Sequence, residues 1–503
     1  MQYLVNSREM KNCDKNTIEE FKVPLEVLME RAALSVVRSI KKEKYCLNRI
    51  LIVCGNGNNG GDGVAVARLL ALEGYDVTIL LANSGKKFSD GMKRQMEIAK
   101  KYELNIIEEW QENAYTLIVD AIFGIGLTRA VEGREKELIQ KINDSQGKVV
   151  SVDIASGIST DTGQVMGIAV KADLTVTFAY KKLGQVLYPG AEYTGRLKVC
   201  DIGIEEHSWL EKKPSYYAIQ KEDLSLLPQR EKRTHKGSYG KVLLIAGSSN
   251  MAGAAILAAK AAYASGCGLV RVFTAEENRS VILGAVPEAI VTTYAAKKTD
   301  KTELTEAIQW ADVVAIGPGI GIDAWAKEMV KTVLDVSAVP VIMDADALNI
   351  LSQNKNALLR PHTELIVTPH LGEMASLREV SVSYIIDILI AEAEEFAREY
   401  NVICVLKDAR TICSIPYGKT YVNLSGNHGM ATAGSGDVLC GLLAGLVAQG
   451  THPDLAAPLG VYIHGRSGDL AANEVGYHGL VASDLANGIK KVMKLEGEES
   501  ENL

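Results

Sequence analysis

Short apolar runs alternate with amphipathic stretches along most of the chain. In the first half these runs have the length of buried β-strands, and we predict strands at Ile50–Cys54, Val77–Ala82, Leu117–Val119, Val149–Val152 and Leu174–Phe178. Helical spacing fills the intervals, for example at Val64–Glu73 and Ser89–Tyr102. Strands that alternate with helices in this way are typical of α/β folds with mainly parallel sheets.

The second half repeats the pattern. Its predicted strands are Lys241–Ala246, Leu269–Phe273, Val313–Ile316, Val341–Met343, Leu365–Thr368 and Val402–Leu406. Two further runs, Ile412–Ile415 and Thr420–Leu424, flank a Pro-Tyr-Gly-Lys turn and predict a β-hairpin. Leucine and valine residues recur at helical spacing between Leu439 and Val447, which predicts a buried helix.

A charged stretch separates the two halves. Residues 205–233 hold two prolines and no sustained apolar period, as is typical of a linker. A chain of 503 residues is also too long for one ordinary domain. We therefore predict a first domain at residues 1–210, a linker at 211–233 and a second domain at 234–500.

The composition argues against several classes of function. A formal net charge of −8 does not favour nucleic acid as the main partner. The chain has no apolar run of about 18 residues and no basic start before an apolar segment, so neither a membrane helix nor a signal peptide is predicted. Its eight cysteines form no Cys-x-x-Cys pair, which favours reduced thiols. We expect a cytoplasmic protein that binds neither nucleic acid nor membrane.

Polar and glycine residues gather where the predicted strands of the first half end. They are Gly55–Gly63 after the first strand, Asp120 and Phe123–Leu127 after the third, and Asp153 with Ala155–Gly157 after the fourth. Parallel sheets bind ligands outside the carboxyl ends of their strands. We therefore expect these loops to converge on one crevice.

The first of these loops matches the dinucleotide motif Gly-x-Gly-x-x-Gly at Gly55, Gly57 and Gly60. A dinucleotide site also requires an acidic residue at the end of the next strand, and this chain has none there. NAD-dependent hydride transfer is therefore disfavoured. A plain strand-to-helix turn is an alternative explanation for the glycines.

That alternative does not explain the paired amides of Asn58 and Asn59. Together with Asp120 and Ser156, their side chains could supply oxygen ligands to a hard cation. A monovalent ion is one possibility, because oxygen ligands alone do not fix the identity of the ion.

The predicted strands of the second half also end in polar loops. These loops are Gly247–Ala254, Gly317–Gly321, Asp344–Asn349, Pro369–Glu373 and Lys407–Thr411. Together they predict one large ligand-binding face. The charged residues of these loops also have plainer explanations. Asp344 and Asp346 can cap a helix, and His370 can be an ordinary loop residue. Glu373 can suit a helix dipole, and Lys407 can be solvated.

The segment Asn427–Leu439 is a glycine-rich turn directly before the predicted buried helix. Unpaired N–H groups at a helix N-terminus form a site for phosphate. Asp437 in this turn could accept the proton of a hydroxyl group that attacks a phosphoryl group, or it could simply cap the helix. The chain has neither a P-loop motif nor the protein-kinase motifs, so phosphoryl chemistry would require another fold.

Several motifs resemble known families. Thr234–Lys241, Gly317–Gly321, Asp344–Leu348, Thr368–Glu373 and Asn427–Leu439 look like the ADP-dependent NAD(P)H-hydrate dehydratases of the ribokinase-like superfamily. Asn58–Gly63 and Val152–Gly157 are similar to motifs of the NAD(P)H-hydrate epimerases. In this order, and over nearly the whole chain, they resemble the bifunctional nicotinamide-nucleotide repair enzymes.

The resemblance implies a Rossmann-like three-layer αβα domain followed by a ribokinase-like α/β domain with a mostly parallel sheet. It also implies one activity for each domain. The first domain interconverts the R and S hydrates of NAD(P)H, and the second dehydrates the S form with ADP, releasing AMP and phosphate. K⁺ in the first domain and Mg²⁺ in the second are expected cofactors. Many members of such families self-associate, so a homo-oligomer is expected.

The resemblance also assigns residues. The K⁺ ligands are Asn59, Asp120 and Ser156. The hydrate-binding residues of the first domain are Asn58, Asn59, Gly60, Gly61, Asp62, Gly124, Ile125, Gly126, Leu127, Thr128, Arg129, Ala130 and Asp153. Those of the second domain are Ala254, Gly319, His370 and Asp437. The nucleotide-binding residues are Lys407, Asp408, Ala409, Arg410, Thr411 and Gly436. Asp437 and Asp153 are the candidate catalytic residues.

Some positions depart from the family patterns. Ala155 replaces a common proline, and Asp408 replaces a glycine beside the nucleotide site, where an added carboxylate would not help a diphosphate to bind. Two other functions stay open: a small-molecule kinase that phosphorylates an alcohol, and a first domain that acts as a ligand-binding or protein-interaction module.

Overall fold

The computed structural model describes residues 1–83, 87–112, 114–295, 301–359 and 362–497. Residues 498–500, the predicted end of the second domain, lie outside this range. The chain divides into two compact units, the first unit (Tyr3–Ser215) and the second unit (Met1–Gln2 with Tyr216–Leu503). Part of the stretch predicted as a linker lies in the second unit, where β10 (Tyr216–Ala218) pairs with β19 (Thr420–Val422).

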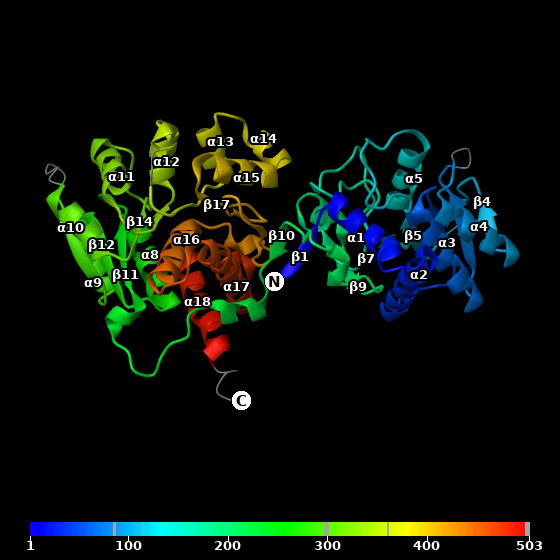
Figure 1. Ribbon diagram of the computed structural model, residues 1–503, viewed down its shortest axis with the longest axis horizontal. Helices are drawn as coiled ribbons and strands as arrows, with labels where there is room; N and C mark the ends of the chain where they lie inside the picture. Colours follow the sequence, from blue (N-terminus) through cyan, green and yellow to red (C-terminus); the bar gives the residue numbers. More distant parts are fainter. Residues whose placement is uncertain (84–86, 113, 296–300, 360–361, 498–503) are drawn as a thin grey trace. The chain divides into compact units, whose positions relative to one another are not determined.

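A seven-stranded parallel sheet forms the centre of the first unit, in the order β4-β3-β2-β5-β6-β7-β9 (Figure 1). Its strands are β2 (Ile50–Cys54), β3 (Val77–Leu81), β4 (Asn105–Ile107), β5 (Leu117–Ala121), β6 (Lys148–Val152), β7 (Leu174–Phe178) and β9 (Arg196–Cys200). The strands predicted from the sequence are confirmed. The edge strands β4 and β9 were not predicted, because both are only partly buried and neither is a continuous apolar run.

Helices cover both faces of this sheet, which confirms the three-layer αβα arrangement. One face carries α2 (Leu25–Lys42), α3 (Asn58–Leu72) and α4 (Asp90–Lys101), and the other carries α5 (Gly133–Asp144). Successive residues of β2 serve the two layers, since Ile52 packs in the core on the α3 side and Val53 packs in the core on the α5 side. The other elements of the first unit are β1 (Gln2–Val5), α1 (Ser7–Glu19), β8 (Lys181–Lys182), α6 (Leu183–Val186), α7 (Gly190–Thr194) and η1 (Glu206–Trp209).

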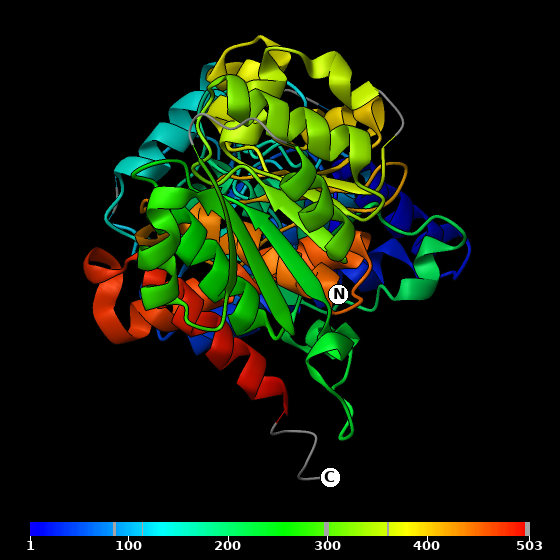
Figure 2. The ribbon, with the colours of Figure 1, turned by 90° about the vertical axis from the view of Figure 1, so that its left-hand side faces the viewer.

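The sheet of the second unit follows the order β13-β12-β11-β14-β15-β16-β17-β18-β19-β10 (Figure 2). Its further strands are β11 (Lys241–Ile245), β12 (Leu269–Ala275), β13 (Ile290–Tyr294), β14 (Val313–Ile316), β15 (Val341–Met343), β16 (Leu365–Val367), β17 (Ile403–Leu406) and β18 (Ile412–Ser414). The pairs are parallel except at the predicted hairpin, where β17, β18 and β19 run antiparallel. The mostly parallel sheet and the hairpin are thus confirmed.

Helices lie on both faces of this sheet as well. On one face are α8 (Ala252–Ser265), α16 (Ser435–Ala448) and α17 (Pro453–Gly479), and on the other is α10 (Thr302–Trp310) (Figures 1 and 2). The remaining helices are η2 (Lys221–Leu226), η3 (Lys236–Tyr239), η4 (Glu276–Asn278), α9 (Arg279–Ala285), α11 (Ala324–Val336), α12 (Asp346–Ser352), η5 (Lys355–Leu359), α13 (Leu371–Arg378), α14 (Val382–Asp387), α15 (Leu389–Tyr400), η6 (His428–Met430) and α18 (Ala482–Gly497).

The predicted buried helix is confirmed as α16, which packs very closely against α8. A Cβ atom added at Gly441 of α16 would lie only 2.0 Å from the carbonyl oxygen of Ala258 in α8. One helical turn further along, a Cβ atom at Gly445 would lie 2.8 Å from the carbonyl oxygen of Ala262. The two helix backbones therefore approach each other at positions where only glycine fits.

We expect Gly441→Ala to destabilise the second unit by about 3 kcal/mol, because the added methyl group forces α16 away from α8. Amide hydrogen exchange in α16 under increasing urea measures this change. Gly284→Ala is the matched control, since a Cβ atom there meets nothing within 4 Å. Because Gly284 lies in α9, alanine at this position should leave stability unchanged or raise it by about 0.5–1 kcal/mol. Equal effects of the two substitutions would contradict the close-packing explanation.

Candidate active sites

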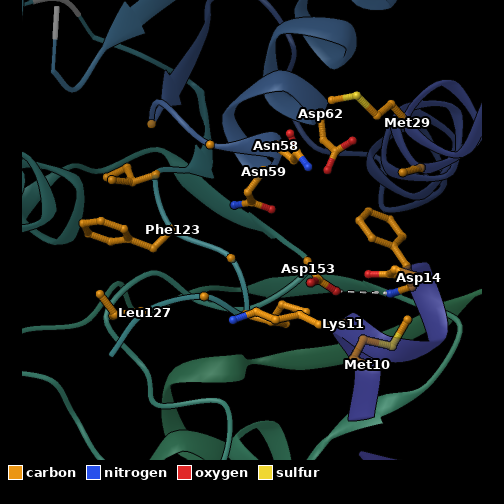
Figure 3. A pocket seen from close by; sticks show the side chains of 18 of the residues that line it. Met10, Lys11, Asp14, Met29, Asn58, Asn59, Asp62, Phe123, Leu127 and Asp153 are labelled. Atoms are coloured by element: carbon orange, nitrogen blue, oxygen red, sulfur yellow. Dashed lines mark hydrogen bonds between the residues drawn. The ribbon is translucent and has the colours of Figure 1, made fainter. Parts of the chain in front are cut away.

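A cavity of about 610 Å³, the first-unit cavity, opens outside the carboxyl ends of β2, β5 and β6 (Figure 3). Of the residues predicted to bind a hydrate, those that line it are Asn58, Asn59, Asp62, Gly124, Ile125, Gly126, Leu127, Thr128, Arg129 and Asp153. The loops that follow the three strands thus share one space, as a parallel sheet arranges them.

Three residues of that predicted set do not line the cavity. A Cβ atom at Gly60 would lie 1.9 Å from the carbonyl oxygen of Gly55, and one at Gly61 would lie 2.5 Å from Cε of Met29. Both glycines therefore allow the first turn of α3 to pack tightly against its neighbours. Ala130 is exposed beside the cavity. A hydrate-binding role for these three residues stays a prediction.

Asp153 lies directly after β6 and faces the cavity (Figure 3). Its backbone adopts a left-handed φ of +64°, which is unfavourable for a residue with a side chain. Oδ1 of Asp153 accepts hydrogen bonds from Nζ of Lys182 at 2.5 Å and from Oγ1 of Thr177 at 3.0 Å. Lys182 is 1% exposed, and its ammonium group also donates to Oγ1 of Thr177 and the carbonyl of Phe178. With three acceptors, all three N–H donors of Lys182 are satisfied.

Two more carboxyl groups face this cavity, from α1 and α3 (Figure 3). The pKa of Asp14 is raised to about 7, mainly by burial and also by the charge of Asp153, although the charge of Lys182 lowers it. Burial, with the charges of Asp153 and Asp14, raises the pKa of Asp62 well above its ordinary value. Burial and the charges of neighbouring carboxylates therefore favour the protonated forms of Asp14 and Asp62.

The predicted cation ligands lie beside the cavity floor. Asp120 is fully buried and accepts hydrogen bonds from Oγ of Ser156 at 2.5 Å, from the Ser156 N–H at 2.9 Å and from Oγ of Ser151 at 2.8 Å. Burial raises the pKa of Asp120, and these hydrogen bonds lower it. Nδ2 of Asn59 is buried without a hydrogen-bond partner in the described part of the chain.

This set of donors fits a hard monovalent cation. Turning the Asn59 amide by 180° puts its oxygen at the unpaired position, and crystallographic amides are assigned by this same criterion. Asn59, Asp120 and Ser156 then offer amide, carboxylate and hydroxyl oxygens, which are the atoms that such cations prefer. The residues present are therefore compatible with the predicted ion.

In the second unit, Lys407 at the end of β17 connects two of the predicted loops. Its Nζ lies 2.7 Å from Oδ1 of Asp344 and 4.0 Å from Oε2 of Glu373. Oγ1 of Thr368 also donates to Oδ1 of Asp344, at 2.7 Å. Burial lowers the pKa of Lys407, but Asp344 and Glu373 outweigh it and raise the pKa overall. Burial raises the pKa of Glu373 to about 7. We call Asp344, Glu373 and Lys407 the Lys407 cluster.

Helix capping explains His370 and Glu373, whose side chains form a capping box at the start of α13, but it does not explain the two aspartates. Neither Asp344 nor Asp346 caps α12; Asp346 instead accepts a hydrogen bond at 2.8 Å from the N–H of Gly321 in a neighbouring loop. His370 does cap α13, because its Nδ1 accepts from the N–H groups of Gly372 and Glu373. Its ring is exposed on the other side, so a hydrate-binding role stays a prediction.

The N-terminus of α16 lies beside the Lys407 cluster. Gly434, at a left-handed φ of +89°, ends the preceding turn and starts the helix. A Cβ atom at Gly436 would lie 3.4 Å from Nζ of Lys407 and 3.6 Å from Oδ2 of Asp344. The N–H groups of the first helical turn have no partner within the helix, so they form an anion site next to the ammonium group.

Asp437, in the same turn, is half-buried and forms no capping hydrogen bond. Burial raises its pKa to about 6; Asp344 and Asp346 raise it further, and Lys407 lowers it. The Asp437 carboxyl group is therefore mostly ionised at neutral pH, yet close enough to its pKa to take up a proton. This combination suits a general base.

The remaining predicted residues of the second unit lie on the same edge of the sheet. A Cβ atom at Gly319 would lie 3.2 Å from Cβ of Ala254, so the loop after β14 contacts the start of α8. Oγ1 of Thr411 donates to the carbonyl of Asp408 at 3.2 Å and closes the turn after β17. Asp408 and Ala409 are exposed in this turn, next to Arg410.

The sequence analysis missed Asp14, Lys182 and His464. Asp14 lies on an amphipathic helix, where its carboxylate cannot be told from the solvated carboxylates nearby in the sequence. Lys182 directly follows another lysine, so the pair resembles an ordinary charged surface segment. His464 is buried in α17, and its Nε2 lies 3.0 Å from the carbonyl oxygen of Ser435 in the first turn of α16. Burial lowers the pKa of His464 to about 4, so the ring is neutral. Lys182 lies between a buried strand and an apolar segment, and this unusual position was the weak signal that could have identified it.

No helix in the described part of the chain is long and apolar enough to cross a membrane.

Two family profiles match this chain. The NAD(P)H-hydrate dehydratase family matches residues 242–491. The family described as YjeF-related protein N-terminus matches residues 25–184. The first match falls in the second unit and the second match in the first unit.

Curated relatives are similar over both units. The bifunctional NAD(P)H-hydrate repair enzyme of Moorella thermoacetica is 39% identical over 528 aligned residues, which cover 100% of this chain and 98% of that protein. The enzyme of the same name from Escherichia coli is 35% identical over 456 residues, covering 89% of this chain and 85% of that protein. A solved ribokinase-like superfamily protein from Enterococcus faecalis has a TM-score of 0.50 and 30% identity, and covers 56% of this chain and 96% of its own. The expected ribokinase-like fold is thus confirmed.

The raised pKa of Asp437 predicts a pH-dependent effect of Asp437→Asn on stability. In the unfolded chain the pKa of this carboxyl group is about 4, so between about pH 4 and 6 the folded state binds more protons and stability falls as pH rises. At pH 8 we expect the variant to be more stable than the parent by about 1–2 kcal/mol. Near pH 4 the gain should disappear. Amide exchange in α16 at the two pH values measures this, and a gain that does not change with pH would contradict the assignment.

Proposed function

Because the chain belongs to the family of bifunctional NAD(P)H-hydrate repair enzymes, we propose that its first unit is the epimerase and its second unit is the dehydratase. The enzyme repairs NAD(P)H hydrates with an epimerase activity and an ADP/ATP-dependent dehydratase activity. The positions of the two profile matches support the division between the units.

The first-unit cavity is our proposed site for the hydrate. Its volume of about 610 Å³ lies in the range of small-molecule sites. The hydrate carries a hydroxyl group on a ring carbon beside the ring nitrogen, and epimerisation requires water to leave this carbon and return on the other face. Asp153, whose Oδ1 accepts a hydrogen bond from Lys182, is positioned to take and return a proton there.

We propose that the cation beside the cavity floor is K⁺, held by Asn59, Asp120 and Ser156. The unpaired amide of Asn59 and the two buried oxygen donors support this proposal. When bound, the ion supplies a positive charge that anchors an anionic part of the hydrate. Asn59 would serve both the ion and the hydrate, because it also lines the cavity.

In the second unit we propose that Asp437 is the general base. It would take the proton of the S-hydrate hydroxyl as that oxygen attacks the terminal phosphoryl group of ADP. The first-turn N–H groups of α16 and the ammonium group of Lys407 would stabilise the negative charge that develops. The phosphorylated oxygen then leaves as phosphate, driven out by the lone pair of the ring nitrogen. Loss of a proton from the adjacent ring carbon completes the double bond of NAD(P)H, and AMP is the second product.

Mg²⁺ is the proposed companion of the diphosphate. In the described residues no group of three or more His, Cys, Asp or Glu side chains could hold a metal ion by itself. Mg²⁺ is often bound by substrate phosphates and one or two carboxylates, which this site offers in Asp344 and Glu373. When bound, it neutralises charge on the diphosphate.

We also propose a cytoplasmic location and self-association. All eight cysteines are free thiols, which is compatible with a reducing compartment. Sedimentation of the purified protein tests the oligomeric state.

The contact of the α16 N-terminus with the Lys407 cluster, with Asp437 beside it, is the observation that carries the dehydratase assignment. The test mixes the full chain with R and S NADH hydrate, ADP and Mg²⁺ and follows the return of NADH absorbance. We expect complete conversion by the parent protein, with free phosphate as product. A stable phosphate ester would instead identify a small-molecule kinase and contradict the proposal.

Two variants separate the activities. Asp437→Asn should slow dehydration by about 10²–10⁴-fold, because it removes the proton acceptor. Asp153→Asn should leave dehydration of the S form intact, and conversion should stall once that form is consumed. A near-normal rate in either assay would remove that aspartate from its proposed role.

Potassium should affect both stability and epimerisation. In tetramethylammonium buffer, we expect epimerisation to slow and the Tm of the first unit to fall; added KCl should restore both, since a ligand that binds only the folded state stabilises it. Ser156→Ala should weaken the response of Tm to KCl. Identical Tm values in the two buffers for the parent protein would contradict a bound K⁺.

A further inference from the structure

Asp14 is an unpaired carboxyl group that faces the first-unit cavity from α1 (Figure 3). Its side chain forms no hydrogen bond or ion pair with the residues that the structure describes, whereas Asp153, which also faces the cavity, is bound by Lys182 and Thr177. The two side chains come from different elements, α1 and the loop after β6. Besides Asp14, the charged and titratable residues that line this cavity are Lys11, Asp62, Arg129, Glu135, Asp153 and Lys182.

We propose that Asp14 is a second proton-transfer residue of the epimerase and works as a pair with Asp153. The proposal rests on the epimerase function proposed for this cavity. Epimerisation removes a hydroxyl group from one face of the ring and adds it to the other, so it requires one proton donor and one proton acceptor in the same site. The leaving hydroxyl group and the entering water lie on opposite faces of the ring, so two carboxyl groups from different elements suit the two proton transfers better than one.

The step balances with these two groups. Protonated Asp14 gives its proton to the ring hydroxyl, the C–O bond breaks with help from the nitrogen lone pair, and water leaves. A water molecule then attacks the same carbon from the other face and gives its surplus proton to the Asp153 carboxylate. The reverse epimerisation runs with the roles exchanged, and no oxidant or reductant is needed.

The environments of the carboxyl groups set these roles. Lys182 forms an ion pair with Asp153. Asp14 lacks such a partner in the described part of the chain, and burial together with the charge of Asp153 raises its pKa to about 7, despite the opposing charge of Lys182. Burial and the charges of Asp153 and Asp14 raise the pKa of Asp62 well above its ordinary value. Asp14 can both give and take a proton near neutral pH, which suits a reversible reaction.

The experiment measures epimerisation of NADH hydrate by the full chain across pH 5–9, with spontaneous epimerisation subtracted. Asp14→Asn should slow the reaction by about 10²–10³-fold, and Asp14→Glu should restore part of the rate. In the parent protein the rate should fall as pH rises through about 7, because Asp14 then loses its proton. This fall should be absent from the residual activity of Asp14→Asn.

Two controls address folding. Glu19→Gln changes an acid on the same helix whose side chain is 57% exposed, and it should leave epimerisation unchanged. The first unit of Asp14→Asn should keep the amide exchange of β2 and β5, because the substitution removes a charge whose burial is unfavourable. Dehydration of the S hydrate by the same variant should match the parent.

The proposal is overturned if Asp14→Asn epimerises within about two-fold of the parent, or if that variant keeps the fall above pH 7. It is also overturned if Asp62→Asn abolishes this fall while Asp14→Asn does not, since Asp62 would then hold the role. Two other outcomes would contradict the proposed epimerase function itself rather than the role of Asp14. These are a near-normal epimerisation rate in Asp153→Asn and the absence of epimerisation by the parent protein.

Discussion

An ammonium group paired with an aspartate at a strand end anchors both candidate sites. Lys182 holds Asp153 in the first unit, and Lys407 holds Asp344 in the second. Each pair is largely removed from water, where an unpaired charge is unfavourable by several kcal/mol, so each partner depends on the other. In both units carboxyl groups outnumber the ammonium group, and some of them have pKa values of about 6 or 7. Acid–base chemistry near neutral pH follows from this imbalance of charge.

The arrangement of strands was largely predictable, because continuous apolar runs such as Ile50–Cys54 are buried on both faces of a parallel sheet. The edge strands β4, β9 and β13 were not, since one side of each meets solvent and the apolar pattern breaks down. The α/β class and the parallel sheets could therefore be predicted from the local pattern of residues. The strands at which each sheet ends could not, because they depend on packing.

The candidate sites show the same division. Polar residues that directly follow a strand, such as Asp153 and Lys407, were found because parallel strands deliver their ends to one edge. Asp14 was missed because its position over the cavity depends on how α1 packs, which no local pattern encodes. Gly60 and Gly61 show the opposite case. A glycine that allows close packing and one that approaches a ligand look identical in a sequence; the structure shows the close packing, and ligand contact at these two glycines stays a prediction.

The close contact between α16 and α8 has a consequence for the anion site at the N-terminus of α16. Backbone lies against backbone at Gly441, with no flexible side chain between the helices, so α16 has little freedom to slide or tilt. The N–H groups of its first turn are therefore pre-organised before any anion arrives. Most of the loss of conformational entropy occurs when the chain folds, and a bound diphosphate meets donors that need no rearrangement.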